Sequence, residues 1–411
     1  MERTIPETPP TLQPSIGLSD LVFYGTGTIL GAGIFVVVGQ VVGQAGGLAP
    51  IAYAAAGAVA LCTALSFAEL GARIPSAGGP IDYVDRAFGV RWLATAIGLT
   101  MTTANIVSGA TIATGFTAYL TSLTPVSHWV VIPCLVATFG LISISGMKQS
   151  ARFMMLTTGL GILTLIYVIW ALRYNIAAAP PKIAESLTNF QPADAAATFS
   201  AAFLAIYAFI GFGDMALTAE EVRNVKRTLP RGIMISLGMV FVFYFAIASA
   251  LAGAPDIGGI ARANAPLAEA VNQVGGAGTL VAVASLFIIV NGGLSQIIAA
   301  SRLIFDLARD GRGVHPKFSF VSPRTKTPVF ATLFCLCMVL LLALFVPLKT
   351  LATLTSFAIL IVFIFTNASL WCLKLRSQPH DVPNTPIVLP VIGVFACSAA
   401  VLVQLYLWLV A

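Results

Sequence analysis

Long stretches without any charged side chain limit the fold of this chain more than any other feature. Residues 21–68 and 92–147 contain no Asp, Glu, Lys or Arg over 48 and 56 positions. Seven shorter charge-free runs follow, at 153–172, 195–213, 232–255, 270–301, 327–348, 350–373 and 382–411. A helix that crosses a lipid bilayer needs about 20 mostly apolar residues. Each shorter run therefore accommodates one such helix, and each of the two longest accommodates two.

These runs predict an all-α polytopic membrane protein with about eleven spans. We place the spans at 18–43, 48–70, 92–121, 128–146, 150–173, 197–219, 230–253, 278–306, 328–346, 349–373 and 387–410. Helices are expected rather than a barrel, because the runs are continuously apolar and too long for alternating strands. The chain has 22 Lys and Arg, 16 Asp and Glu, and a mean hydropathy of +0.93. This composition excludes a soluble enzyme and a disordered protein.

The placement of the basic residues predicts the orientation of the chain. With a cytoplasmic N-terminus, the inside segments hold 18 of the 22 Lys and Arg, and the outside segments hold 4. Cytoplasmic loops of membrane proteins carry such an excess of basic residues. Because eleven is odd, the C-terminus is predicted outside. The net charge of +6 thus indicates topology and no nucleic-acid partner. A plasma membrane, and specifically a bacterial inner membrane, is the expected location.

The spans divide the chain into two blocks of five and one remaining helix. We predict a disordered cytoplasmic tail at 1–16, a first five-helix repeat at 17–173 and an external loop at 174–196. A second five-helix repeat follows at 197–373, and a loop with the eleventh span occupies 374–411. Because five is odd, the second block enters the membrane with the opposite orientation to the first.

Glycines interrupt the first span of each block. Span 1 carries Gly31 and Gly33 near its middle, and span 6 carries Gly211 and Gly213. Glycine lowers the cost of leaving helical geometry, and the start of the following half-helix attracts a carboxylate. Glycine-interrupted spans at matching positions of an inverted repeat are typical of a transporter's central site. Helix packing is the competing interpretation of the first cluster, because Gly27 and Gly31 also fit a small-xxx-small pattern.

Several motifs resemble those of a known family. They follow one another in the order that the family shows, at 29–35, 67–70, 74–80, 86–89, 146–152, 218–231 and 300–311. On these residues the chain is similar to the amino acid permeases of the amino acid–polyamine–organocation superfamily, which share the leucine-transporter fold. The resemblance covers nearly the whole chain. It implies a 5+5 inverted-repeat bundle with broken spans 1 and 6, plus one extra C-terminal span.

The resemblance implies a secondary active transporter, either a symporter or an exchanger, that moves an amino acid by alternating access. The expected partners are this small substrate, the lipid bilayer and a coupling proton. A neutral amino acid is expected because the predicted site has few charged side chains, with a cationic amino acid or polyamine as the alternative. A channel and an intramembrane enzyme are distant alternatives. The sequence has no HExxH or GxSxG motif, so no enzyme, cofactor or metal site is predicted.

The resemblance also implies a substrate site, residue by residue. Backbone N–H groups are expected to bind the substrate carboxylate, at Gly31, Ala32, Gly33 and Ile34. Backbone carbonyls are expected to bind the substrate ammonium, at Ile29, Tyr207 and Ile210. The expected pocket or gate side chains are Asn105, Tyr207, Phe209, Phe212 and Gln296. For Asn105 and Gln296, a hydrogen bond between helices is an equal alternative.

Asp214 is the acidic residue of greatest interest. An ionised carboxylate within a span is costly, so Asp214 is a candidate for binding a proton or a cation. The alternative is that it caps the inner half of span 6.

Two departures from the family leave proton coupling, sodium coupling and pure exchange open. Proton-coupled members often carry a Lys in span 5 where Gly161 stands, and Ser295 lacks the adjacent hydroxyl of sodium-coupled relatives.

Overall fold

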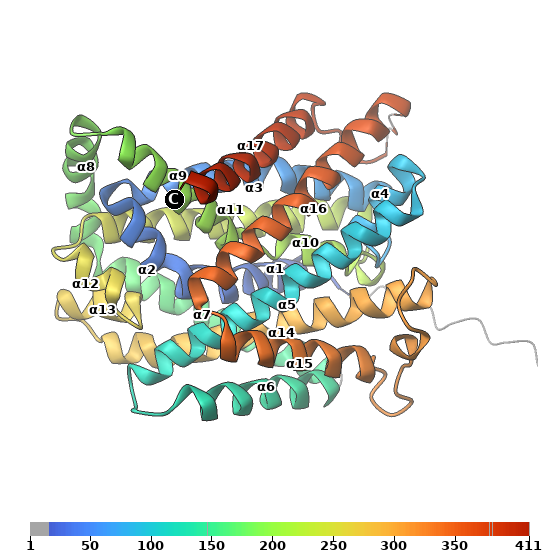
Figure 1. Ribbon diagram of the computed structural model, residues 1–411, viewed down its shortest axis with the longest axis horizontal. Helices are drawn as coiled ribbons and strands as arrows, with labels where there is room; N and C mark the ends of the chain where they lie inside the picture. Colours follow the sequence, from blue (N-terminus) through green and yellow to red (C-terminus); the bar gives the residue numbers. More distant parts are fainter. Residues whose placement is uncertain (1–15, 146, 378, 380, 411) are drawn as a thin grey trace, which may run out of the picture.

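The computed structural model describes residues 16–145, 147–377, 379 and 381–410, and these fold into a bundle of helices (Figure 1). Within these ranges the only β-structure is an isolated parallel bridge between Ile16 and Val222. The α-helices are α1 Leu18–Ala32, α2 Ile34–Ala45, α3 Ala49–Arg73, α4 Pro80–Phe88, α5 Arg91–Thr121, α6 His128–Ser145, α7 Met147–Ala171, α8 Arg173–Thr188, α9 Pro192–Ile206, α10 Phe212–Ala216, α11 Val225–Ala252, α12 Ile257–Arg262, α13 Pro266–Gln273, α14 Gly278–Arg309, α15 Val329–Phe345, α16 Leu348–Arg376 and α17 Val388–Val410. Short 3₁₀ helices lie at Gly46–Leu48, Tyr207–Phe209, Ala219–Glu221 and Pro316–Ser319.

Eight stretches of the described residues are long and apolar enough to cross a membrane, which confirms a polytopic all-α protein. They are Ile34–Arg73, Arg91–Thr121, Phe153–Ala171, Pro192–Ala216, Val225–Ala252, Gly278–Arg309, Leu348–Arg376 and Val388–Leu409. The apolar helices His128–Ile144 and Val329–Phe345 are shorter. The segment 174–196, expected as an external loop, is largely helical in α8 and the start of α9.

The centre of the bundle is formed by α1, α2 and α10, with the long helices α3, α5, α11, α14 and α16 around them (Figure 1). The helices α5 and α14 bury most of their length, whereas α17 at the periphery buries the least. The exposed side chains of α17 include Phe395, Leu402 and Leu409. Such apolar surfaces are suited to contact with lipid, because a membrane protein presents apolar side chains outward.

The two ends of the bundle differ. The short helices α8, α12 and α13 lie at one end, and α4 and the segment 310–328 lie at the other (Figure 1). At this second end, Glu69 of α3 is fully buried and contacts Arg73 at 2.5 Å and Lys374 at 2.7 Å. The backbone N–H of Thr385 also donates to Glu69 at 2.7 Å. One carboxylate thereby joins α3 to α16 and to the segment that leads to α17.

A second set of contacts at the same end involves the start of the described chain. The backbone of Ile16 accepts from Arg223 and donates to Glu221, both at 2.9 Å. The Glu221 carboxylate also contacts Arg302 of α14 at 3.3 Å. The segment before α1 is therefore attached to the chain that follows α10. Residues 1–15 of the expected tail lie outside the described residues.

Candidate functional site

The first helix break lies at Gly33. Its backbone angles are φ −81° and ψ −86°, so α1 ends at this residue and α2 begins immediately after it. The first i to i−4 bond of α2 runs from the Val37 N–H to the Gly33 carbonyl, at 3.2 Å. The N–H groups of the first turn find no acceptor within their own helix, so this end carries a partial positive charge.

The second break is longer and separates α9 from α10. After a 3₁₀ turn at Tyr207–Phe209, Ile210 is extended and Gly211 has φ +126°. Residues with a side chain rarely adopt this angle. A methyl group on Gly211 would also lie 3.0 Å from the backbone nitrogen of Ile29 in α1. Glycine at this position therefore lets the second break pack directly against the backbone of α1.

Other glycines of α1 serve helix packing. A methyl group on Gly31 would lie 2.5 Å from the backbone nitrogen of Gly292 in α14. A methyl group on Gly27 would lie 1.9 Å from the hydroxyl of Thr158 in α7. The two interpretations of the glycine cluster thus apply to different residues, because Gly33 ends the helix whereas Gly27 and Gly31 allow close packing.

Asp214 lies between three helices. Its side chain in α10 is buried, with 2% of the residue exposed, and accepts hydrogen bonds from Asn105 of α5 at 3.4 Å and Gln296 of α14 at 3.1 Å. The amide oxygens of Asn105 and Gln296 have no hydrogen-bond partner among the described residues. Hydrogen bonds between helices, the alternative for these two amides, are therefore present. The three side chains bring several acceptor oxygens together in the interior.

The expected aromatic side chains are all buried around the second break. The hydroxyl groups of Tyr207 and Ser108 are 3.4 Å apart, and the Tyr207 carbonyl accepts from the Ile210 N–H at 3.3 Å. The Phe209 ring packs edge-on against the ring of Tyr244, at 5.2 Å between centroids. The Phe212 ring packs against the rings of Phe67 and Phe363. The break thus has apolar aromatic walls.

Tyr244 of α11 is a site residue that the sequence did not reveal. Its hydroxyl donates to the carbonyl of Ile29 at 3.0 Å. A methyl group on Gly33 would lie 2.2 Å from this hydroxyl. The only signal in the sequence is that Tyr244 is one of three hydroxyl side chains in the span 230–253, with Ser236 and Ser249. Such a signal does not indicate which residue it contacts.

Comparison with known proteins identifies the family. The family model described as amino acid permease matches residues 16–410. The chain belongs to the amino acid permease family. This result confirms the resemblance seen in the motifs, and the family consists of permeases rather than enzymes.

Three relatives illustrate the range of this permease family. "Cationic amino acid transporter 4, vacuolar" of Arabidopsis thaliana is 27% identical over 397 residues, which cover 91% of this chain and 65% of the relative. A branched-chain amino acid permease of Bacillus subtilis is 26% identical over 423 residues, covering 95% of this chain and 88% of the relative. An uncharacterized transporter of Mycobacterium bovis is 29% identical over 396 residues, which cover 95% of this chain and 86% of the relative. The chain thus spans just under two thirds of the plant protein.

The two positions where this permease departs from ion-coupled relatives make ordinary packing contacts. A methyl group on Gly161 of α7 would lie 3.4 Å from Ile288, which is a van der Waals distance. The hydroxyl of Ser295 donates to the carbonyl of Asn291 in its own helix, at 3.0 Å. Within the part of the chain that the structure describes, no three His, Cys, Asp or Glu side chains are grouped as a metal site would require.

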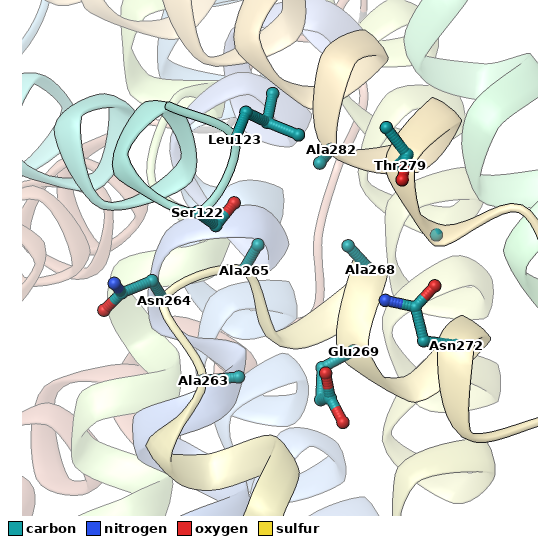
Figure 2. Close-up of a pocket in the computed structure, with 11 residues that line it drawn as sticks. Ser122, Leu123, Ala263, Asn264, Ala265, Ala268, Glu269, Asn272, Thr279 and Ala282 are labelled. Carbon is teal, nitrogen blue, oxygen red and sulfur yellow. The ribbon is translucent and has the colours of Figure 1, made fainter. Parts of the chain in front are cut away.

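A pocket of this permease lies away from the breaks, at the end of the bundle that holds α13 (Figure 2). Its volume is about 250 Å³, and its walls come from the end of α5, the segment 263–272 and the start of α14. Polar side chains on these walls include Ser122, Asn264, Glu269, Asn272 and Thr279. None of the expected substrate-site residues lines it, so the pocket is distinct from the candidate site.

Proposed function

We propose that this permease is a secondary active transporter that moves an amino acid across a membrane by alternating access. The carrying observation is that the start of α2 meets the 3₁₀ turn at 207–209 in the buried centre, where a methyl group on Gly33 would lie 2.5 Å from the Ala208 carbonyl oxygen. An amino acid has a carboxylate and an ammonium on one carbon, so it requires donors and acceptors side by side. We assign the carboxylate to the N–H groups of Gly33 and Ile34 at the start of α2, and the ammonium to the carbonyls of Ile29, Tyr207 and Ile210. The expected N–H groups of Gly31 and Ala32 lie in the last turn of α1.

We also propose a 5+5 inverted repeat with eleven spans. The first repeat contains α1 to α7, the second contains α9 to α16, and α17 is the extra span. The observation that supports this division is a break in the first helix of each repeat. The uneven distribution of Lys and Arg supports a cytoplasmic N-terminus and an external C-terminus. A bacterial inner membrane is the proposed location.

A neutral amino acid is the first candidate substrate. Tyr207, Phe209 and Phe212 provide apolar surfaces beside the breaks. The nearby acid, Asp214, has a hydrogen-bond donor on each of its oxygens, from Asn105 and Gln296. Two protein amides therefore stabilise the Asp214 carboxylate, so it does not require a cationic group of the substrate as a partner. We assign Asp214 the uptake of the coupling proton.

A cationic amino acid or a polyamine is the second candidate, and one observation favours it. The unpaired amide oxygens of Asn105 and Gln296 are buried beside the Asp214 carboxylate. A buried acceptor without a donor is costly, and an ammonium group carries three donors. The relatives also include proteins named for cationic and for branched-chain amino acids.

Exchange in liposomes tests the proposal. Purified protein would be reconstituted with unlabelled L-leucine, L-arginine or putrescine inside, and entry of the matching labelled compound would be measured. We expect saturable exchange of L-leucine, which also separates a transporter from a channel. Preference for L-arginine or putrescine would favour the second candidate. Absence of exchange across a full panel of amino acids and polyamines would refute the proposed function.

A further inference from the structure

We propose that the hydroxyl of Tyr244 is a substrate ligand that changes its hydrogen-bond partner when the substrate arrives. In this structure it donates to the Ile29 carbonyl; with substrate bound it donates to the substrate carboxylate. The change releases the Ile29 carbonyl for the substrate ammonium. This inference rests on the proposed function, because it assigns a further residue to the same site.

The Tyr244 hydroxyl lies where it can reach both proposed partners, the Ile29 carbonyl and the substrate carboxylate. Its donor bond to Ile29 is 3.0 Å long, and this carbonyl belongs to the set proposed for the ammonium. The same hydroxyl lies next to Gly33, which belongs to the set proposed for the carboxylate. It also occupies the space where a side chain on Gly33 would begin, 2.2 Å from the position of a methyl group. One hydroxyl is therefore adjacent to both halves of the expected zwitterion site.

The ring holds this hydroxyl in place. Tyr244 is fully buried, and its ring packs edge-on against Tyr53 and Phe209, at centroid distances of 5.9 and 5.2 Å. The oxygen cannot leave the site without displacing these rings. Its proton, in contrast, rotates about the C–O bond and follows the better acceptor. A change of partner therefore requires no movement of the ring or of α11.

The chemistry favours the change of partner. A phenol has one proton to donate, so it cannot serve the carbonyl and a carboxylate fully at the same time. A hydrogen bond to a charged acceptor is roughly twice as strong as one between neutral groups. A carboxylate at the start of α2 therefore competes successfully for the proton. The vacated carbonyl then accepts from the ammonium, which is a charged donor.

The test removes the hydroxyl and keeps the ring, in Tyr244→Phe. The matched control is Tyr53→Phe, because the Tyr53 hydroxyl is buried in the same aromatic cluster and has no hydrogen-bond partner among the described residues. The probes are L-leucine and L-arginine, each compared with its methyl ester, which keeps the ammonium and lacks the charged carboxylate. Affinity is measured by ligand-induced thermal stabilisation of the purified protein over a concentration series.

We expect Tyr244→Phe to weaken binding of the free amino acid roughly tenfold, since it loses a charged hydrogen bond in the loaded site and a neutral one in the empty site. Binding of the ester should change by less than about threefold, because a neutral ester gains little from the phenol. Tyr53→Phe should leave both affinities unchanged. Tyr244→Met, which also lacks the hydroxyl, should give the same ratio of acid to ester affinity.

Three results would overturn the inference. Equal weakening for acid and ester would mean that Tyr244 has only a structural role. Tighter binding of the acid by Tyr244→Phe would mean that the hydroxyl only blocks the site. Unchanged affinities would mean that it takes no part in binding. Failure of the unmodified protein to bind any amino acid of a full panel would instead refute the proposed function, and the inference with it.

Discussion

The break at Gly33 allows a sharp test, because the structure leaves no room for a side chain there. In Gly33→Ala, the added methyl group would lie 2.2 Å from the Tyr244 hydroxyl and 2.5 Å from the carbonyl oxygen of Ala208. An ordinary contact begins at 3.4 Å, so the distance to Ala208 must grow by about 0.9 Å, from 2.5 to 3.4 Å. Ala208 lies in the 3₁₀ turn of the second break. The substitution therefore pushes the two breaks apart.

The size of this displacement sets the expected effect. Overpacking of a tight interior costs about 1–3 kcal/mol, which most folded proteins tolerate. Misplacing interacting groups by about 1 Å lowers a rate about 100-fold. We therefore expect Gly33→Ala to express and insert, to unfold at a lower temperature, and to exchange amino acid about 100 times more slowly. Gly33→Val should have no measurable exchange.

The assay is exchange of labelled L-leucine in liposomes. Gel filtration measures the amount of folded protein, so that each variant is reconstituted in equal amount. Gly159→Ala is the matched control, because a methyl group at that glycine of α7 meets no atom within 4 Å. Alanine is also preferred to glycine within a helix, by about 0.5–1 kcal/mol. Wild-type exchange by Gly33→Ala would refute the reasoning, since it would mean that the two breaks need not touch.

Three further substitutions test other parts of the structure. Asp214→Asn removes the proposed proton site, so we expect it to retain exchange but lose accumulation driven by an imposed pH gradient; unchanged accumulation and selectivity would make Asp214 structural. Glu69→Gln leaves two buried cations, Arg73 and Lys374, without a charged partner, and should destabilise the protein by about 3–5 kcal/mol in chemical unfolding; a loss below about 1 kcal/mol would contradict this. Gly211→Ala imposes a side chain at φ +126° and should cost about 1–3 kcal/mol, together with most of the exchange activity; a fully active variant would show that the second break relaxes freely.

The sequence predicted the helices and both breaks for physical reasons. Charge-free runs indicate buried or lipid-facing helices, because a charge inside the membrane is costly. Glycines indicated both breaks, since Gly33 follows the end of α1 and Gly211 directly precedes α10. The sequence did not show which glycine of the cluster ends α1. Gly31 and Gly33 are the same residue type, and they differ only in what they contact in the folded protein.

The contacts of the site lay beyond the sequence. Asn105 and Gln296 are 109 and 82 positions from Asp214, and nothing in the intervening chain specifies that their amides meet its carboxylate. Tyr244 is 215 positions from Ile29, whose carbonyl it contacts. Such pairs depend on how α5, α11 and α14 pack around α1. Local propensity carries no information on that packing.

The contact between Gly31 and Gly292 has a mechanical consequence. The backbones of α1 and α14 approach so closely that a methyl group on Gly31 would lie 2.5 Å from Gly292. Most helix pairs interlock through side chains that fit into grooves, and sliding them requires each side chain to climb out of its groove. Gly31 and Gly292 have no side chains, so no side chains interlock where the two backbones meet. A small shear of α1 along α14 would therefore disturb no interlocked pair of side chains at this point, although Asn291 of α14 faces Gly27 of α1 one turn away.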